Sequence, residues 1–314
     1  MHVFLANPRG FCAGVDRAVD VVHELLTLVG PPIYVRHAIV HNHVVVAELE
    51  ARGAVFVEDI EEIPAGAIAV MSAHGVPRAV IEAARARGLR VVDATCPLVS
   101  KVQLEVLRQT AKDRTVVIIG HRGHVEIEGL IGHRHPERGG VVVVETKEEA
   151  ETVTVPRPDA VAYVTQTTLA VDATREIVAV LRRRFPALAA PHGSTICYAT
   201  QNRQQAVVQL ARRCDPIVVI GAPHSSNSRR LAEVAEESGA RAIPIERAAE
   251  LSPAQFAGCR RVGVTASASA PEALVAEVVA WLAEHLPPVS VYEIGEPEAV
   301  HFRPPATLRA FQRR

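Results

Sequence analysis

The strongest constraint in this sequence is an alternation of short β-branched runs with amphipathic stretches of about ten to eighteen residues. Parallel strands need a crossover long enough for a helix, so this alternation predicts parallel sheets covered by helices, an α/β fold. The expected strands are 33–40, 54–57, 67–71, 90–93, 115–120, 140–145, 160–165, 216–221, 241–245 and 261–265. The expected helices are 15–28, 44–52, 78–87, 98–112, 169–184, 199–213, 227–238 and 271–285.

Two soft boundaries, near Pro97 and within 186–193, divide this pattern into similar segments. They predict a first α/β lobe with the N-terminal strand, a second lobe, a third lobe and a C-terminal extension that packs back on the lobes. The corresponding ranges are 1–96, 97–193, 194–285 and 286–314.

Composition excludes several classes of protein. The 314 residues carry 34 Lys and Arg against 35 Asp and Glu, so there is no basic excess for nucleic acid. No apolar run reaches the roughly 18 residues of a membrane span, and the N-terminus lacks a signal-peptide pattern. Five cysteines without an export signal predict reduced thiols. We expect a cytoplasmic protein, a monomer or weak dimer, that binds neither nucleic acid nor membrane.

Small polar clusters follow the carboxyl ends of the expected strands. In open α/β sheets, ligands bind outside these ends, where helix N-termini present free N–H groups. A single cluster of this kind usually only caps a helix, but six of them exceed what capping needs. They occupy 72–75, 93–96, 120–124, 165–168, 224–228 and 265–269.

The five cysteines separate by their place in the pattern. Cys12, Cys96 and Cys197 each precede an expected helix, where the helix N-terminus favours the thiolate. Cys214 ends a helix and Cys259 precedes a strand, at the opposite ends of the elements. Each alone is compatible with a small buried hydrophobe. Together, the first three suit an iron–sulfur cluster or zinc with one open coordination position, although no C-x-x-C is present.

Histidines and hydroxyl residues at the same strand ends favour a phosphate or diphosphate ligand, because they offer imidazole, hydroxyl and amide donors. No G-x-x-x-x-G-K or G-x-G-x-x-G motif supports a nucleotide. The candidate binding residues are His41, His74, His124, Ser225, Ser226, Asn227 and Ser269.

Glu126 is the carboxylate closest in sequence to these histidines, and it is placed to donate a proton. The alternative is an exposed glutamate in a first helical turn. The segment H-R-G-H-V-E also permits a zinc hydrolase using His121 and His124, although three thiolates argue against it. A cluster-bearing sensor without catalytic activity is the second alternative.

Nine motifs occur in an order that resembles the 4-hydroxy-3-methylbut-2-enyl diphosphate reductase family, from about Val3 to Glu272. They are A-N-P-R-G-F-C-A-G-V, V-H-N, S-A-H-G-V-P, D-A-T-C-P-L-V, G-H-x-G-H-x-E, T-Q-T-T-L, I-C-Y-A-T-x-N-R-Q, S-S-N-S-x-R-L and T-A-x-A-S-A-P-E. The resemblance implies three α/β lobes in a pseudo-threefold arrangement around a central [4Fe–4S] cluster. It also implies reductive dehydroxylation of an allylic diphosphate, with two electrons, two protons and loss of water. The products would be isopentenyl and dimethylallyl diphosphate, at the last step of the non-mevalonate route.

Carried over by position, the resemblance makes Cys12, Cys96 and Cys197 the cluster ligands, with an open apical iron. It makes Glu126 the proton donor and Thr167 the residue that holds the substrate hydroxyl. It implies a reduced ferredoxin or flavodoxin as electron donor. The implied substrate-binding set is His41, His74, His124, Thr167, Ser225, Ser226, Asn227 and Ser269.

Four positions depart from the family pattern. Ala38 stands where glutamate is common, and Ser267 replaces a glycine. Val125 replaces a proline and removes a backbone constraint beside Glu126. His224 stands where asparagine is frequent, and we favour solvent over the diphosphate pocket for its side chain.

Overall fold

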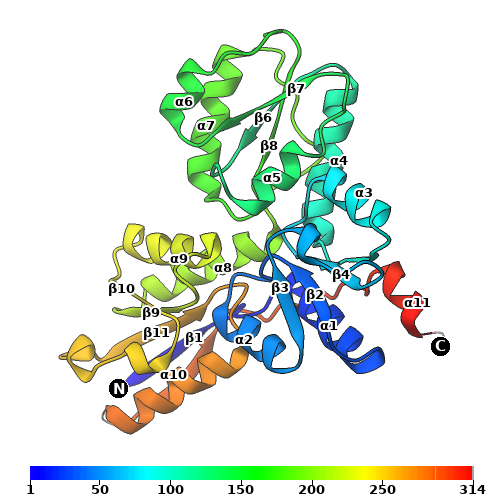
Figure 1. Ribbon diagram of the computed structural model, residues 1–314. Coiled ribbons are helices and arrows are strands. Elements are labelled where there is room, and N and C mark those ends of the chain that lie inside the picture. The colour runs from blue at the N-terminus through cyan, green and yellow to red at the C-terminus, as the bar shows by residue number, and fades with distance from the viewer. Residues whose placement is uncertain (287, 313–314) are drawn as a thin grey trace. The chain divides into compact units, whose positions relative to one another are not determined.

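The computed structural model describes residues 1–286 and 288–312, and contains three sheets whose recorded strand pairs are all parallel (Figure 1). The α/β prediction is therefore confirmed. The chain divides into two compact units. Unit 1 comprises Met1–Asp16, His41–Ala47 and Tyr198–His301, and unit 2 comprises Arg17–Val40, Glu48–Cys197 and Phe302–Arg314. Helices α1 (Ala13–Leu28) and α2 (His43–Ala51) each contribute residues to both units.

Unit 1 is built on a five-stranded sheet with the order β10-β9-β11-β1-β12. Alternate strand residues face opposite sides of the sheet, as the strand period requires. Val218 packs in the cluster that includes α10, and Val219 packs in the cluster formed with α8 and α9. The strands are β1 (His2–Ala6), β9 (Ile217–Ile220), β10 (Ala242–Ile245), β11 (Arg261–Ala266) and β12 (Ser290–Ile294). The helices are α8 (Tyr198–Ala211), α9 (Ser226–Glu237) and α10 (Glu272–His285), with short 3-10 turns at Ala248–Glu250 and Pro253–Phe256.

Unit 2 contains the other two sheets, with the orders β3-β2-β4-β5 and β7-β6-β8. The first sheet consists of β2 (Ile33–Arg36), β3 (Ala54–Val57), β4 (Ile68–Met71) and β5 (Arg90–Asp93), with α3 (Arg78–Ala86) and a 3-10 turn at Ile60–Glu62. The second consists of β6 (Thr115–Ile119), β7 (Gly140–Val144) and β8 (Val161–Thr165). Unit 2 also contains α4 (Pro97–Ala111), α5 (Val125–Ile131), α6 (Lys147–Thr152) and α7 (Val171–Arg184).

The N-terminal strand lies in a different sheet from the other strands of 1–96. It was expected in the first lobe, but β1 pairs with β11 and β12 in the sheet of unit 1. Strand pairing joins segments far apart in sequence, and the periodicity of a strand does not encode its neighbour. The four proposed domain ranges stay a prediction, and so does the pseudo-threefold arrangement of lobes.

Some elements also differ in length or were not expected. The strand expected over 33–40 ends at Arg36, because His37 adopts a left-handed conformation with φ 57°. Helices α5 and α6 and strand β12 were not expected, since segments of five to seven residues carry too little periodicity.

The C-terminal extension over 286–314 contributes to both units. Strand β12 pairs with β1 in unit 1. In unit 2, α11 (Arg309–Gln312) follows a 3-10 turn at Ala306–Leu308, and the Arg90 guanidinium lies 4.2 Å from the centroid of the Phe311 ring. Residues 287, 313 and 314 of this extension lie outside the described residues.

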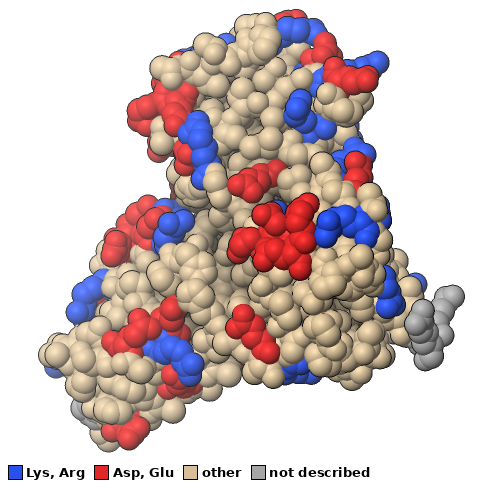
Figure 2. Space-filling model, viewed as in Figure 1, with Lys and Arg blue, Asp and Glu red and all other residues tan. Residues whose placement is uncertain are grey.

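Positive and negative side chains are interspersed on the face shown in Figure 2. Among the described residues, no helix combines the length and the apolarity that crossing a bilayer requires. The face shown in Figure 2 presents no broad basic surface to an anionic ligand.

We expect Ile118→Ala to destabilise the protein by about 2–5 kcal/mol, because Ile118 is fully buried in β6 and its truncation leaves a cavity. Urea denaturation measures the loss. The control is Leu104→Ala on α4, whose side chain is 58% exposed and whose removal should change stability by less than about 0.5 kcal/mol. Equal losses in both variants would contradict the buried position of β6.

Candidate active site

The residues singled out from the sequence fall into two groups, one in each unit, and each group gathers beyond strand ends. Unit 1 holds Cys12, His41, Ser225, Ser226, Asn227 and Ser269. Unit 2 holds His74, Cys96, His124, Glu126, Thr167 and Cys197.

The cysteines divide structurally as the sequence predicts. Cys12 directly precedes α1, Cys96 is the N-cap residue of α4, and Cys197 directly precedes α8. All three are half-buried, and none of the five cysteines, all of them described, forms a disulfide. Cys214 lies in the core behind α8, where burial raises the pKa of its thiol to about 11. Only the first three are therefore placed at helix starts, where a thiolate is favoured.

A buried arginine holds the turn that carries Cys12. Arg203 on α8 is 1% exposed, and its guanidinium donates to the carbonyl oxygen of Gly10 at 2.8 and 3.1 Å and to that of Phe11 at 3.2 Å. It also pairs with Glu298 at 3.0 Å. The Cys12 N–H donates to the carbonyl of Ala268 at 3.2 Å. The conformation of this turn thus depends on a charge in the core of unit 1.

Sequence reasoning did not assign a role to Arg203, although it lies within the I-C-Y-A-T-x-N-R-Q motif. The sequence did contain a signal that Arg203 has a specific role. Arg203 shares the helix face of Ala199, Ala206 and Leu210, which are all buried. A charged residue at a core position of an amphipathic helix needs specific partners, here the backbone carbonyls of the cysteine turn.

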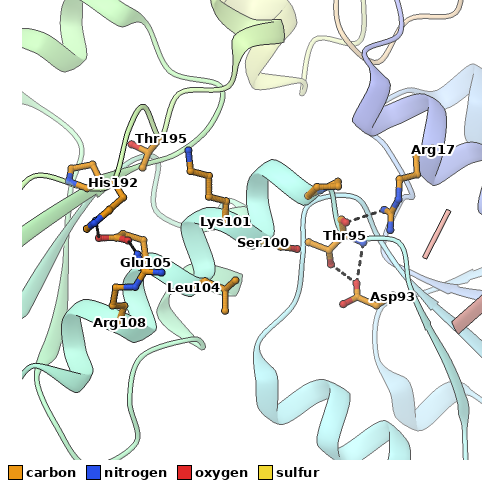
Figure 3. A pocket seen from close by; sticks show the side chains of 12 residues that line it. Arg17, Asp93, Thr95, Ser100, Lys101, Leu104, Glu105, Arg108, His192 and Thr195 are labelled. Carbon is orange, nitrogen blue, oxygen red and sulfur yellow. Dashed lines mark hydrogen bonds and ion pairs between the residues drawn. The ribbon is translucent and has the colours of Figure 1, made fainter. Parts of the chain in front are cut away.

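A second arginine holds the turn before Cys96. The Arg17 guanidinium donates to the carbonyl oxygen of Thr95 at 3.0 Å (Figure 3). It also donates to the carbonyl oxygen of Ala94 at 3.1 Å. The Asp93 carboxylate accepts from the Thr95 N–H at 2.9 Å, and the Cys96 N–H donates to the carbonyl of Ala73. These bonds fix the backbone between β5 and α4.

Arg17, Asp93 and Thr95 also line a cleft of about 650 Å³ in unit 2 that the sequence did not indicate. Lys101 and His192 lie across it in Figure 3. None of the predicted site residues is among its lining residues.

Glu126 is buried, which rules out the exposed first-turn glutamate considered from the sequence. It is the second residue of α5 and only 2% exposed. Its Oε1 accepts from the Thr167 N–H at 2.7 Å, and its Oε2 accepts from the Thr167 hydroxyl at 2.8 Å. His124 caps the same helix, with its Nδ1 accepting from the Glu126 N–H at 3.1 Å.

Burial raises the pKa of Glu126 to about 7, and the two hydrogen bonds from Thr167 offset part of this effect. Desolvation disfavours the carboxylate, whereas donors to its oxygens favour it. A carboxyl group that is half-protonated near neutral pH is suited to give up a proton.

Hydrogen bonds connect Glu126 to one of the candidate cysteines through a single residue. The Cys197 N–H donates to the carbonyl of Thr167, the residue that also binds Glu126. On the other side, the rings of His74 and His124 meet edge to face, with centroids 6.1 Å apart. Unit 2 therefore assembles four of the expected residues around one carboxyl group.

The polar residues of unit 1 gather at the carboxyl ends of β9 and β11. The Ser269 hydroxyl donates to the carbonyl of His41 at 3.0 Å, and Asn227 Oδ1 accepts from the Ala268 N–H at 2.8 Å. Ser225 caps α9 by accepting from the Ser228 N–H. Asn227 is 5% exposed, and its Nδ2 has no hydrogen-bond partner among the described residues. A buried donor without a partner is costly and points to a ligand acceptor.

The departures from the family pattern are accommodated. Val125 begins α5, and Glu126 remains buried beside Thr167. Ser267 is fully buried with its Oγ 3.4 Å from that of Ser269. His224 is exposed, as favoured from the sequence, and its ring lies near those of His41 and His43. The structure gives no reason for alanine at position 38.

A buried, protonatable carboxyl group and a cluster of uncharged donors, each near half-buried cysteines, define an α/β enzyme acting on an anionic substrate. A model of the LytB protein family matches residues 3–283. The chain is 50% identical over 309 residues to a 4-hydroxy-3-methylbut-2-enyl diphosphate reductase of Methylococcus capsulatus, covering 98% of this chain and 99% of the relative. It is 52% identical over 312 residues to the Stenotrophomonas maltophilia reductase of that name, covering 98% of each.

Two solved structures are also similar to the chain. The E-1-hydroxy-2-methyl-but-2-enyl-4-diphosphate reductase of Plasmodium falciparum gives a TM-score of 0.93 at 33% identity, covering 99% of this chain and 97% of that one. A structure of (E)-4-hydroxy-3-methyl-but-2-enyl diphosphate reductase, the terminal enzyme of the non-mevalonate pathway, gives 0.67 at 34% identity, covering 90% and 99%. This chain belongs to the LytB family of 4-hydroxy-3-methylbut-2-enyl diphosphate reductases.

We expect Arg203→Met to loosen the Cys12 turn, because the carbonyls of Gly10 and Phe11 lose their donors and Glu298 loses its cation. Removing one partner of a buried ion pair costs about 3–5 kcal/mol. Urea denaturation measures that loss, and the alkylation rate of Cys12, followed by peptide mass spectrometry, should rise.

The control is Arg175→Met, whose side chain is 73% exposed and pairs with Asp172 on the same helix. It should leave both the stability and the Cys12 alkylation rate unchanged. Unchanged Cys12 alkylation in Arg203→Met would show that Arg203 does not hold the turn.

Proposed function

We propose that this chain reduces (E)-4-hydroxy-3-methylbut-2-enyl diphosphate to isopentenyl and dimethylallyl diphosphate, taking up two electrons and two protons and releasing water. The names of its relatives over 98% of its length support this substrate. The observation that carries the proposal is Glu126, a buried carboxyl group held by Thr167 with a pKa of about 7. Loss of a hydroxyl group as water requires such a proton donor.

Glu126 supplies the proton for the leaving oxygen through the Thr167 hydroxyl: the Oε2 proton passes to the Thr167 oxygen as the Thr167 hydroxyl proton passes to the leaving oxygen. In the protonated acid, the Oε2–H donates to the Thr167 hydroxyl oxygen, so the Thr167 hydroxyl hydrogen is available to the substrate hydroxyl. As the proton leaves, the new carboxylate accepts from the Thr167 N–H and hydroxyl, whose atoms are already 2.7 and 2.8 Å away. Donors placed in advance stabilise the developing charge without reorganisation.

The diphosphate is bound by uncharged donors. Asn227 Nδ2 is buried without a partner among the described residues, and the hydroxyls of Ser225, Ser226 and Ser269 lie at the ends of the same sheet. His41 joins them through the bond from Ser269. We assign His74 and His124, which lie beside Glu126 in unit 2, to the same substrate.

Cys12, Cys96 and Cys197 fit the ligand set of a [4Fe–4S] cluster. They are half-buried, form no disulfide, and lie at helix starts where the thiolate is favoured. When bound, a cluster with three cysteine ligands supplies electrons and an open iron site that acts as a Lewis acid. A reduced ferredoxin or flavodoxin in the cytoplasm is the proposed electron source.

The zinc hydrolase considered from the sequence receives little support from the histidines of H-R-G-H-V-E. His121 Nδ1 lies 3.5 Å from the Glu145 carboxylate, whereas His124 Nδ1 accepts from the Glu126 N–H. The two rings therefore have separate partners.

We expect Glu126→Gln to lower turnover by about 10²–10⁴-fold while substrate binding is retained, because the amide keeps the shape of the side chain but has no acidic proton. An anaerobic assay with a chemical reductant measures the loss of turnover, and an equilibrium titration measures substrate binding. Near-normal turnover would remove Glu126 from its role.

The pKa of Glu126 also predicts a pH dependence. Only the protonated acid can donate, so turnover in the wild type should fall as pH rises through about 7. The Glu126→Gln variant should lack this limb. The folded state binds a proton that the unfolded chain has lost between about pH 4.5 and 7, so wild-type stability should also decline over this window relative to the variant.

We expect Cys96→Ser to abolish stable cluster binding and Cys214→Ser to retain it, because Cys214 is buried with a raised thiol pKa. Iron and sulfide counts on anaerobically purified protein, with the absorption spectrum, provide the measurement. Colourless wild-type protein containing zinc and no sulfide would instead support the hydrolase. A cluster with substrate binding but no turnover would support a sensor.

A further inference from the structure

Three side chains outside the proposed active site converge on one point of unit 1. They are His43, His224 and Glu246, and one ligand atom from each lies within 4.8 Å of those of the other two. His43 Nδ1 is 3.2 Å from Glu246 Oε1. The ring centroids of His43 and His224 are 4.5 Å apart with an interplanar angle of 38°.

Each residue comes from a different element of the same unit. His43 is the first residue of α2, His224 lies in the turn between β9 and α9, and Glu246 directly follows β10. Because β9 and β10 are neighbouring parallel strands, their carboxyl ends bring His224 and Glu246 together at one edge of the sheet.

The backbone that carries Glu246 is held by hydrogen bonds. The Glu250 side chain accepts from the backbone N–H groups of Glu246 and Arg247, both at 2.8 Å, and so fixes the turn after β10. The Arg247 guanidinium pairs with Glu277 at 3.0 Å, so this neighbouring cation is engaged elsewhere. The Glu246 side chain is 30% exposed, which leaves it accessible to a solvated ion.

We propose that His43, His224 and Glu246 form a binding site for a divalent transition-metal cation, with Zn²⁺ as the representative ion. Two imidazoles and one carboxylate suit Zn²⁺, Co²⁺, Ni²⁺ or Cu²⁺, whereas Mg²⁺ and Ca²⁺ prefer oxygen ligands. Three protein ligands leave a coordination position for water or another oxygen ligand.

The His41 ring meets that of His224 edge to face at 5.6 Å and completes the wall of the site.

The three proposed ligands adjoin the proposed diphosphate-binding residues and are not themselves members of that set. His224 precedes Ser225, and His41 contacts the His224 ring. Cation binding is measured directly and needs no turnover.

Calorimetric titration of anaerobically purified protein with Zn²⁺ tests the site. Wild type should bind one more equivalent than His43→Ala, His224→Asn or Glu246→Gln, or bind that equivalent at least about 10–100-fold more tightly, since even losing a partner of a metal ligand costs this much. Zinc binding to the cysteines is common to all four proteins and cancels in the comparison.

The matched control is His37→Asn. His37 also contacts a carboxylate, that of Glu58 at 2.7 Å, but belongs to no three-ligand cluster among the described residues, and asparagine tolerates its left-handed backbone. This variant should bind Zn²⁺ as the wild type does. Equal zinc binding in wild type and all three ligand variants would overturn the proposal, and so would equal losses in the His37→Asn control.

Co²⁺ provides a second readout of the ligand type. Binding at the proposed site should give weak visible bands typical of nitrogen and oxygen ligands, and these should disappear in His224→Asn. If Co²⁺ gave only intense thiolate charge-transfer bands, unchanged in that variant, the ion would be bound by cysteines and the proposed site would be wrong.

Discussion

The Glu126 carboxyl group is removed from solvent and held by Thr167 through both its backbone N–H and its hydroxyl. Burial alone would drive the group to its neutral form, and two donors alone would keep it ionised. Their opposition leaves a pKa of about 7. Thr167 follows β8, and the start of α5, with Glu126, follows β6. The second sheet of unit 2 therefore brings Thr167 and Glu126 into contact.

Specific hydrogen bonds also hold the turns that carry the half-buried cysteines. Arg203 donates to the turn of Cys12, Arg17 donates to the turn of Cys96, and the carbonyl of Thr167 accepts from the backbone of Cys197. Backbone carbonyls in tight turns at a strand end lack partners within the sheet, so side chains must supply the donors. Ordering these turns before any ligand binds lowers the entropy lost on binding.

The near-neutral chain binds anions, on this proposal, through donors rather than through net charge. The Ala268 N–H donates to Asn227 Oδ1 and so fixes the side chain, which leaves the Asn227 Nδ2 available to a ligand. Neutral donors select a diphosphate by their geometry, and they do not attract other polyanions through net charge. The neighbouring histidines at positions 43 and 224 extend this surface with a different chemistry, suited to a cation.

The sequence alone determined the α/β class, most strand and helix positions, and the division of the five cysteines into three at helix starts and two elsewhere. These features are local, because the period of hydrophobic residues and the residue type at a strand end are both read from neighbouring positions. Tertiary structure decided the pairing of β1 with β11 and β12, the burial of Glu126 against Thr167, and the use of Arg203 and Arg17 to fix the cysteine turns. It also decided the approach of His43, His224 and Glu246. Each of these features joins segments separated by tens to hundreds of residues. A local sequence pattern does not specify which distant segments come into contact.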